Sequence, residues 1–364
     1  MPVVLFVYLC LEMIGLFLQA RNRILFKLWR MKFSDIWYQL KIRKILSLSP
    51  QERSARGIRR TVRLLSNFPG LWQRTIEQTP RGCCQWGSTL FVADGVADHY
   101  VILNSIHHPT GNNFLPRISL PDPDRVWGLH MEPEVYIRQL GYDTLAEHAL
   151  VSRFYTSSES LLVSGGIYRP SPPYVHFLTG KNWDYLSTVP PPCKLITLGI
   201  IVSDLNHLEG HKARVRFLEE IDASGIDCAI WGRGDGLQRF RNYRGFVLNK
   251  WDAQAICRYS IVIENSVSPW YWTEKVTDAL LAYSLPLYHG CPNLGKFLPA
   301  DSFIPININE PGCMERISAI LQADPYSSRI PAIEAARRVL LEKENIYAFL
   351  DRELDELHDT EHNQ

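Results

Sequence analysis

Apolar runs alternate with amphipathic segments between residues 194 and 288, and this alternation limits the possible folds more than any other feature. The predicted strands are 194–202, 227–231, 259–263 and 285–288, and the clearest predicted helices are 212–221 and 273–283. Buried strands that alternate with helices form parallel sheets with helices on both faces. The sequence therefore predicts an α/β domain with Rossmann-like topology in this part of the chain.

The region before residue 188 is less regular but also carries strand-like runs, at 61–66, 99–104 and 125–131. A proline-rich stretch at 185–192 is predicted to be a linker, because proline is disfavoured in helix interiors and central strands. With 364 residues, 46% of them hydrophobic, the chain is long enough for two cores. We predict two Rossmann-like domains, at 59–188 and 189–330, followed at 331–364 by one long helix and an acidic tail.

The N-terminal 58 residues have a different character. Residues 2–18 are mostly apolar, and residues 21–63 hold thirteen Lys and Arg against two acidic residues, a local net charge of +11 in a chain of net charge +1. A basic arm next to an apolar segment favours an anionic membrane surface. The positive-inside rule predicts a body on the cytoplasmic face. We expect no nucleic-acid partner, because the arm lacks a zinc or helix-turn-helix pattern. A translation start at Met13 or Met31 would remove the apolar segment.

The polar residues after the predicted strand 259–263 are the best candidates for a site. Ligands bind at the carboxyl ends of the strands in open α/β sheets, and helix N-termini bind phosphate. Lys275 and Glu274 fall in the first turn of the helix that follows, and Asn265 and Tyr271 lie in the loop before it. Lys275 is unfavourable beside the positive end of a helix dipole unless an anion binds there. A solvated helix start without a ligand is the alternative interpretation.

The same segment resembles the α1,3-fucosyltransferase family, glycosyltransferase family 10, and in particular its bacterial-type members. The resemblance keeps order and spacing over roughly 45 residues. The matching positions are Glu264-Asn265-Ser266, Tyr271, Thr273-Glu274-Lys275, Ala279-Leu280, Pro286, Tyr288, Gly290, Pro292-Asn293, Phe297, Pro299 and Ser302-Phe303-Ile304. The resemblance implies a GT-B fold, in which two Rossmann-like domains face each other across a cleft. Residues 189–330 would bind the nucleotide sugar and residues 59–188 the acceptor.

The family resemblance also assigns roles to single residues. It implies donor contacts at Asn265, Tyr271, Glu274 (ribose) and Lys275 (diphosphate). Weaker matches upstream imply that Arg214 touches the diphosphate, with Arg216 as the rival if the register slips. They also imply that Glu132 is the catalytic base, although the serine that follows this glutamate in the family is replaced by Pro133.

The resemblance implies an inverting transfer of fucose from GDP-fucose to a glycan hydroxyl, with an α1,3 linkage. We expect neither a metal nor a cofactor, a glycan or glycolipid acceptor, and a role in glycoconjugate synthesis such as protein glycosylation. Two alternatives remain open: a related transferase that uses another nucleotide sugar, and a non-catalytic sugar-binding protein on the same fold.

Overall fold

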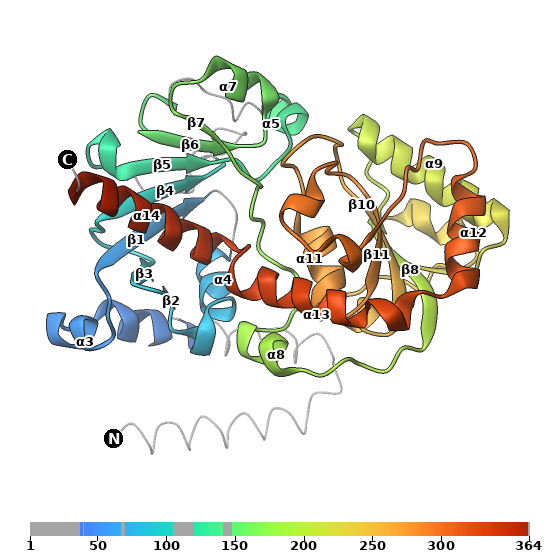
Figure 1. Ribbon diagram of the computed structural model, residues 1–364, viewed down its shortest axis with the longest axis horizontal. Coiled ribbons are helices and arrows are strands. Elements are labelled where there is room, and N and C mark those ends of the chain that lie inside the picture. Colours follow the sequence, from blue (N-terminus) through green and yellow to red (C-terminus); the bar gives the residue numbers. More distant parts are fainter. Residues whose placement is uncertain (1–36, 39, 67–69, 105–119, 141–147, 363–364) are drawn as a thin grey trace, which may run out of the picture.

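The computed structural model describes residues 37–38, 40–66, 70–104, 120–140 and 148–362. The apolar segment 2–18 and the first part of the basic arm, residues 21–36, lie outside the described ranges. None of the helices in the described ranges has the length and apolar character that crossing a bilayer requires. Within these ranges the chain forms two lobes, one built on each of two sheets (Figure 1).

The N-terminal lobe is built on a seven-stranded sheet with the order β2-β3-β1-β4-β5-β6-β7. Its strands pair in parallel except for β2 and β3, which are antiparallel. The strands are β1 (Arg60–Ser66), β2 (Gln85–Trp86), β3 (Thr89–Val92), β4 (His99–Leu103), β5 (Val126–Leu129), β6 (Arg153–Thr156) and β7 (Tyr168–Pro170). The central strands are buried along nearly their whole length, which explains why they appear as apolar runs in the sequence.

The C-terminal lobe is built on a five-stranded parallel sheet with the order β12-β11-β10-β8-β9. The strands are β8 (Ile196–Ser203), β9 (Cys228–Arg233), β10 (Cys257–Ile263), β11 (Leu285–His289) and β12 (Ile304–Pro305). The chain adds β9 on one side of β8 and then continues on the other side with β10. The strand order therefore reverses between β8 and β10, which is where doubly wound sheets bind ligands.

Helices cover the faces of both sheets. In the first lobe they are α3 (Pro50–Ala55), α4 (Leu71–Glu77), α5 (Glu134–Leu140) and α7 (Glu159–Ser164). In the second they are α8 (Trp183–Thr188), α9 (Glu209–Ser224), α10 (Lys250–Gln254), α11 (Glu274–Leu281), α12 (Cys313–Ala323) and α13 (Tyr326–Glu342), and the last helix is α14 (Ile346–His362). Each predicted strand and helix between residues 194 and 288 is confirmed, with ends shifted by a few residues.

Two predictions about the connections are wrong. The linker does not begin at residue 185, because 183–188 form α8, whose N-cap Asn182 accepts a hydrogen bond from the Tyr185 backbone. The single helix predicted after residue 331 is two helices. Pro331 lies inside α13 rather than at a helix start, so the boundary at residue 330 cuts through a helix. Asn345 ends the first helix and begins the second, since its side chain bonds the Leu341 carbonyl and the Ala348 amide.

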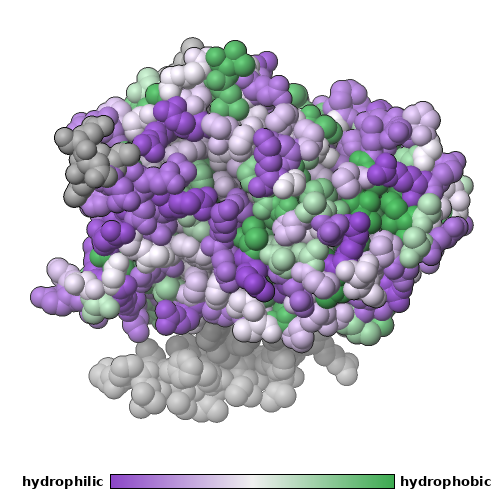
Figure 2. Space-filling view, viewed as in Figure 1, coloured by the Kyte–Doolittle hydropathy of each residue, from purple (hydrophilic) through white to green (hydrophobic). Residues whose placement is uncertain are grey.

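The last helix returns to the first lobe, across which it runs in Figure 1. Tyr347, Leu350 and Leu354 are buried in the core of the N-terminal sheet. The acidic residues Asp351 and Asp355 both pair with Arg60 at the start of β1. The predicted acidic tail is therefore part of the N-terminal lobe, and the face that this helix turns outward is hydrophilic (Figure 2).

Candidate active site

The point of strand reversal carries a buried arginine. Arg214 of α9 is 5% exposed, and its two terminal nitrogens donate to Ser203 Oγ and to Asn265 Oδ1, both at 3.2 Å. Ser203 ends β8, and Asn265 follows β10 by two residues. Arg214 thus joins the carboxyl ends of the two strands. Its Nε has no hydrogen-bond partner among the described residues.

The N-terminus of α11 lies beside the same strand ends. The N-cap Thr273 donates from its backbone and its hydroxyl to the Glu264 carboxylate, at 2.9 and 2.7 Å. Lys275 Nζ lies 3.3 Å from Glu264 Oε2 and 3.1 Å from Thr273 Oγ1. The Glu264 side chain has no exposed surface, whereas that of Lys275 is 23% exposed. Lys275 is therefore paired with a buried carboxylate, and its exposed part remains accessible to a ligand in the site.

Glu274, its neighbour in the sequence, belongs to a second buried cluster. Lys250 Nζ lies 3.1 Å from Glu274 Oε1 and 2.8 Å from Asp278 Oδ2. Burial alone would raise the pKa of Glu274, but Lys250 and Lys275 lower it to about 2. Burial raises the pKa of Asp278 to about 6 against the opposing charge of Lys250. The cluster holds Glu274 as a carboxylate, which is the form that accepts hydrogen bonds from hydroxyl groups.

Glu132 faces this site from the N-terminal lobe. It follows β5, and the backbone N–H of the preceding Met131 donates to Asn104 Oδ1 at 2.5 Å. Burial raises the pKa of Glu132 to about 7, and the charges that act on it are those of Lys275, Glu274 and Glu264. A carboxyl group with a pKa near neutrality suits a general base.

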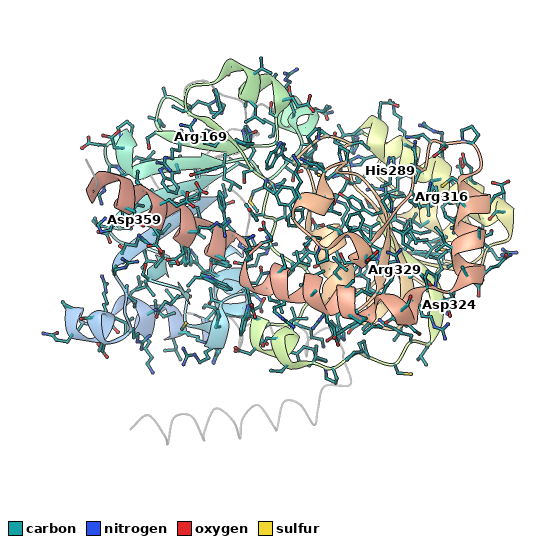
Figure 3. All side chains as sticks on the ribbon, viewed as in Figure 1. Arg169, His289, Arg316, Asp324, Arg329 and Asp359 are labelled. Atoms are coloured by element: carbon teal, nitrogen blue, oxygen red, sulfur yellow. The ribbon has the colours of Figure 1, made fainter. Side chains whose placement is uncertain are left out.

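Two hollows lie along the carboxyl edge of the C-terminal sheet. The large cleft, about 870 Å³, is lined by the ends of β8 and β9, by α4 of the other lobe, and by Lys250 and Glu274. The small pocket, about 330 Å³, is lined by Glu264, Asn265, the N-terminus of α9 and Val135 of α5. His289 at the carboxyl end of β11 also lines the small pocket, and Figure 3 shows it at the opposite end of the lobe from Asp324.

Arg214 and Lys275 lie between these hollows. Arg214 bonds Ser203, which lines the large cleft, and Asn265, which lines the small pocket. Lys275 bonds Glu264 of the small pocket, while its neighbour Glu274 lines the large cleft. An extended ligand that reached from one hollow toward the other would pass both cations.

The structure brings the predicted site residues together. Arg214 and Asn265 are in contact, and Glu132, Glu274 and Lys275 act on one another electrostatically. Tyr271 is 1% exposed, and burial with Glu264, Glu132 and Glu274 around it raises its pKa well above the usual value. The rival Arg216 is exposed and lines the small pocket. The geometry favours Arg214 at the strand ends.

Three functional candidates escaped the sequence reasoning: Glu264, Lys250 and Asp278. Glu264 was visible only as a motif position, and Lys250 lies in a short helix without a distinctive pattern. Asp278 falls on the buried face of α11. Because carboxylates are rarely buried without a partner, this position could have indicated a buried ion pair. Among the described residues, no group of three or more His, Cys, Asp and Glu side chains is arranged to hold a metal ion.

Comparison with known proteins shows that part of this site lies in a segment similar to a known family. Residues 194–314 match the family model for the glycosyltransferase family 10 (fucosyltransferase) C-terminal domain. A rat 4-galactosyl-N-acetylglucosaminide 3-alpha-L-fucosyltransferase 9 is 30% identical over 138 residues, which is 37% of this chain and 35% of the relative. A putative fucosyltransferase-like protein of Arabidopsis thaliana is 26% identical over 159 residues, 43% of this chain and 28% of the relative. The chain thus spans about a third of these relatives.

A solved glycosyltransferase structure shares the architecture. An α-glucosyltransferase in complex with UDP and a 13-mer DNA superposes with a TM-score of 0.52 at 11% identity, over 81% of this chain and 98% of that one. An α1,3-fucosyltransferase with GDP has a TM-score of 0.46 at 14% identity, over 79% and 92% of the two chains. The predicted GT-B fold, two Rossmann-like domains that face each other, is confirmed.

Proposed function

We propose that the chain transfers fucose from GDP-fucose to a glycan hydroxyl, because residues 194–314 match the family model for the glycosyltransferase family 10 (fucosyltransferase) C-terminal domain. The observation that carries this proposal is the convergence of Arg214, Lys275 and Glu132 at the carboxyl edge of the C-terminal sheet. Two cations there can stabilise a diphosphate leaving group, and a carboxyl group with a pKa near 7 can take a proton from a hydroxyl acceptor.

In the proposed reaction the acceptor hydroxyl attacks the anomeric carbon of fucose and gives its proton to the Glu132 carboxylate. The new C–O bond forms as the bond to the diphosphate breaks, and this single displacement inverts the anomeric configuration. Negative charge grows on the departing GDP, where Arg214, Lys275 and the N-terminal amides of α11 stabilise it. The unpartnered Arg214 Nε is a further donor for that charge. The proposed reaction uses no metal.

The name of one relative supports a proposal for the acceptor and the linkage. The rat relative is named for 3-alpha-L-fucosyl transfer to a 4-galactosyl-N-acetylglucosaminide. We propose the same α1,3 linkage and a related glycan or glycolipid acceptor, as in protein or lipid glycosylation.

A transfer assay tests the proposal. The chain is incubated with 4-galactosyl-N-acetylglucosaminide and, in separate reactions, GDP-fucose, a UDP-sugar and a CMP-sugar, with chelator present. Mass spectrometry should detect a fucosylated product only with GDP-fucose. A product with another donor would favour a related transferase. Saturable binding of GDP without transfer to any acceptor would favour a sugar-binding protein on this fold.

We also propose that the body rests on the cytoplasmic face of an anionic membrane. One support is the net charge of +11 over residues 21–63. The other is a pair of exposed apolar side chains near the start of the described region. Trp37 is 51% exposed and Leu40 is 60% exposed, and Lys41 Nζ lies 4.6 Å from the Trp37 ring centroid. Exposed aromatic and aliphatic side chains beside lysines suit the boundary between lipid headgroups and acyl chains.

A further inference from the structure

A third hollow lies apart from the proposed active site, where the basic arm meets the folded body. It has a volume of about 430 Å³ and is lined by residues of the arm, by the end of α4 and the turn after it, and by the start of α8. We call this hollow the arm pocket. Only Glu77 and Gly180 line both the arm pocket and the large cleft, and none of the residues proposed for fucose transfer lines the arm pocket.

Three basic side chains from separate parts of the chain line the arm pocket. Lys41 comes from the arm, Arg81 from the turn after α4, and Lys181 from the segment before α8. Lys41 Nζ lies 4.6 Å from the centroid of the Trp37 ring. Lys181 Nζ lies 5.2 Å from the centroid of the Tyr185 ring. Within the described ranges, none of the three cations forms an ion pair with a carboxylate.

The two carboxylates that line the arm pocket accept hydrogen bonds from uncharged donors. The Tyr38 hydroxyl donates to Glu77 Oε1, and Gln73 Nε2 donates to the same oxygen at 3.2 Å. The Arg81 backbone amide donates to Asp184 Oδ1 at 2.8 Å. With three cations against two carboxylates, the lining carries a net positive charge and attracts an anion.

The backbone conformation at Arg81 is unusual and is held by neighbours that line the same pocket. Its φ of 55° lies in the left-handed region, which residues other than glycine seldom adopt. Asp184 accepts the Arg81 amide, and Lys41 Nζ donates to the Arg81 carbonyl at 3.3 Å. The Arg81 guanidinium has no hydrogen bond within the described ranges. Backbone strain that keeps an unpaired cation at a pocket is typical of binding sites.

We propose that the arm pocket binds the phosphate of an anionic phospholipid. The planar guanidinium of Arg81 donates two parallel hydrogen bonds to phosphate oxygens, and Lys41 and Lys181 add positive charge. A lipid fits the pocket better than a free phosphate, because Trp37 is 51% exposed and Tyr185 is 42% exposed, and such rings suit the headgroup level of a bilayer. The choice of a lipid rests on the proposed contact with an anionic membrane, and the site is independent of fucose transfer.

Short-chain lipids test the ligand with the full chain. Calorimetry measures the dissociation constants of dihexanoyl-phosphatidylglycerol below its micelle concentration, of dihexanoyl-phosphatidylcholine and of inorganic phosphate. The phosphatidylglycerol should bind about tenfold more tightly than the other two. Equal affinity for inorganic phosphate would overturn the assignment to a lipid, and equal affinity for phosphatidylcholine would overturn the selection of an anionic headgroup.

Matched variants test whether the ligand binds in the arm pocket. Arg81→Gln should weaken phosphatidylglycerol binding about tenfold or more, and Arg81→Lys, which keeps the charge but not the planar fork, should restore only part of it. Lys181→Gln should also weaken binding and leaves the turn at Arg81 unchanged. Arg43→Gln removes an equal charge from an exposed position of the arm outside the pocket lining and should keep the wild-type affinity. Equal losses in Arg43→Gln and in the pocket variants would overturn the site.

Vesicles separate the arm pocket from the proposed membrane contact. On phosphatidylglycerol vesicles, the double variant Arg81→Gln, Lys181→Gln should lose at least tenfold more partitioning than Arg43→Gln, Lys44→Gln, which removes the same charge. Equal losses would overturn the pocket and leave the membrane contact standing. Binding of the short-chain lipid without binding to vesicles would support the pocket and contradict the membrane contact. Fucose transfer to a soluble acceptor should be unchanged in all of these variants.

Discussion

Lys275 Nζ lies 3.3 Å from Glu264 Oε2, so the cation at the start of α11 also neutralises a carboxylate that has no exposed surface. The family resemblance assigns Lys275 only a contact with the diphosphate. The ion pair adds a structural role, because breaking a buried pair leaves one charge uncompensated.

Lys275→Ala should therefore affect both catalysis and stability. We expect kcat to fall by about 10²–10³ through loss of a leaving-group contact. The free energy of unfolding should also fall, by about 3 kcal/mol, because Glu264 is left buried and unpaired. Steady-state kinetics and urea denaturation measure the two effects. Near-normal transfer by Lys275→Ala would contradict the role at the diphosphate, and unchanged stability would contradict the importance of the pair.

Arg214→Ala should reduce kcat/KM by about 10²–10³, because the side chain joins both strand ends and carries an unpartnered nitrogen. Arg216→Ala is the matched control. Arg216 lies two residues after Arg214, carries the same charge and is exposed. The Arg216→Ala variant should therefore retain most of the activity. A larger loss of kcat/KM in Arg216→Ala than in Arg214→Ala would show that Arg216, and not Arg214, contacts the diphosphate.

Glu132 should set the pH dependence of transfer. The base must be ionised, so kcat/KM should rise with pH and level off above an apparent pKa of about 7. Glu132→Gln should abolish transfer while the dissociation constant of GDP stays unchanged. A pH profile that is flat between pH 5 and 8 would remove Glu132 from the role of base.

Glu132 should also contribute to the pH dependence of folding. The folded state raises its pKa from 4.5 to about 7, so between these values the folded protein holds a proton that the unfolded chain has lost. This residue therefore costs stability as pH rises through that window, on the order of 3 kcal/mol in total. Relative to wild type, Glu132→Gln should gain stability at pH 8 and gain little at pH 4. Thermal unfolding across pH measures the difference.

Lys250→Met should destabilise the protein more at pH 8 than at pH 5. Without the lysine, Glu274 and Asp278 share a buried site as two like charges, and a lower pH relieves this by protonating one of them. The expected loss at pH 8 is about 3 kcal/mol. The double variant Lys250→Met, Asp278→Asn should recover part of it. An equal loss of stability at pH 5 and pH 8 would mean that repulsion between Glu274 and Asp278 does not cause the destabilisation.

Binding to vesicles tests the basic arm. Replacing Lys41, Arg43 and Lys44 by Gln should lower partitioning onto phosphatidylserine vesicles by on the order of a hundredfold, since each cation contributes about 1 kcal/mol near an anionic surface. Lys212→Gln changes an exposed lysine on α9 and serves as the control. Equal binding to neutral vesicles would argue against an electrostatic contact.

The sequence predicted the C-terminal sheet well because its strands are buried on both faces and form continuous apolar runs, as in 196–203 and 257–263. It did not predict β2, β6 and β7, which are two to four residues long and too short for a periodic pattern. The division of the last helix was also missed, because Asn345 becomes a cap only through its contacts with Leu341 and Ala348.

Within the site, the sequence predicted the residues that are close along the chain, but it did not predict the contacts with residues from other elements. Asn265, Glu274 and Lys275 lie within one strand–loop–helix unit, so their proximity follows from sequence spacing. Their partners do not: Lys250 reaches Glu274 from another helix, and Glu132 comes from the other lobe.

The return of α14 to the N-terminal lobe has a consequence for the order in which the protein is made. Tyr347, Leu350 and Leu354 complete the core of the sheet that begins at β1, so that core lacks part of its apolar surface until nearly all of the chain has left the ribosome. The core of the C-terminal lobe is complete only with α13, whose Ile333, Leu340 and Leu341 pack into it, so it closes just before the N-terminal core does. A chain cut between α13 and α14 would contain every segment of the C-terminal core but would leave the N-terminal lobe incomplete.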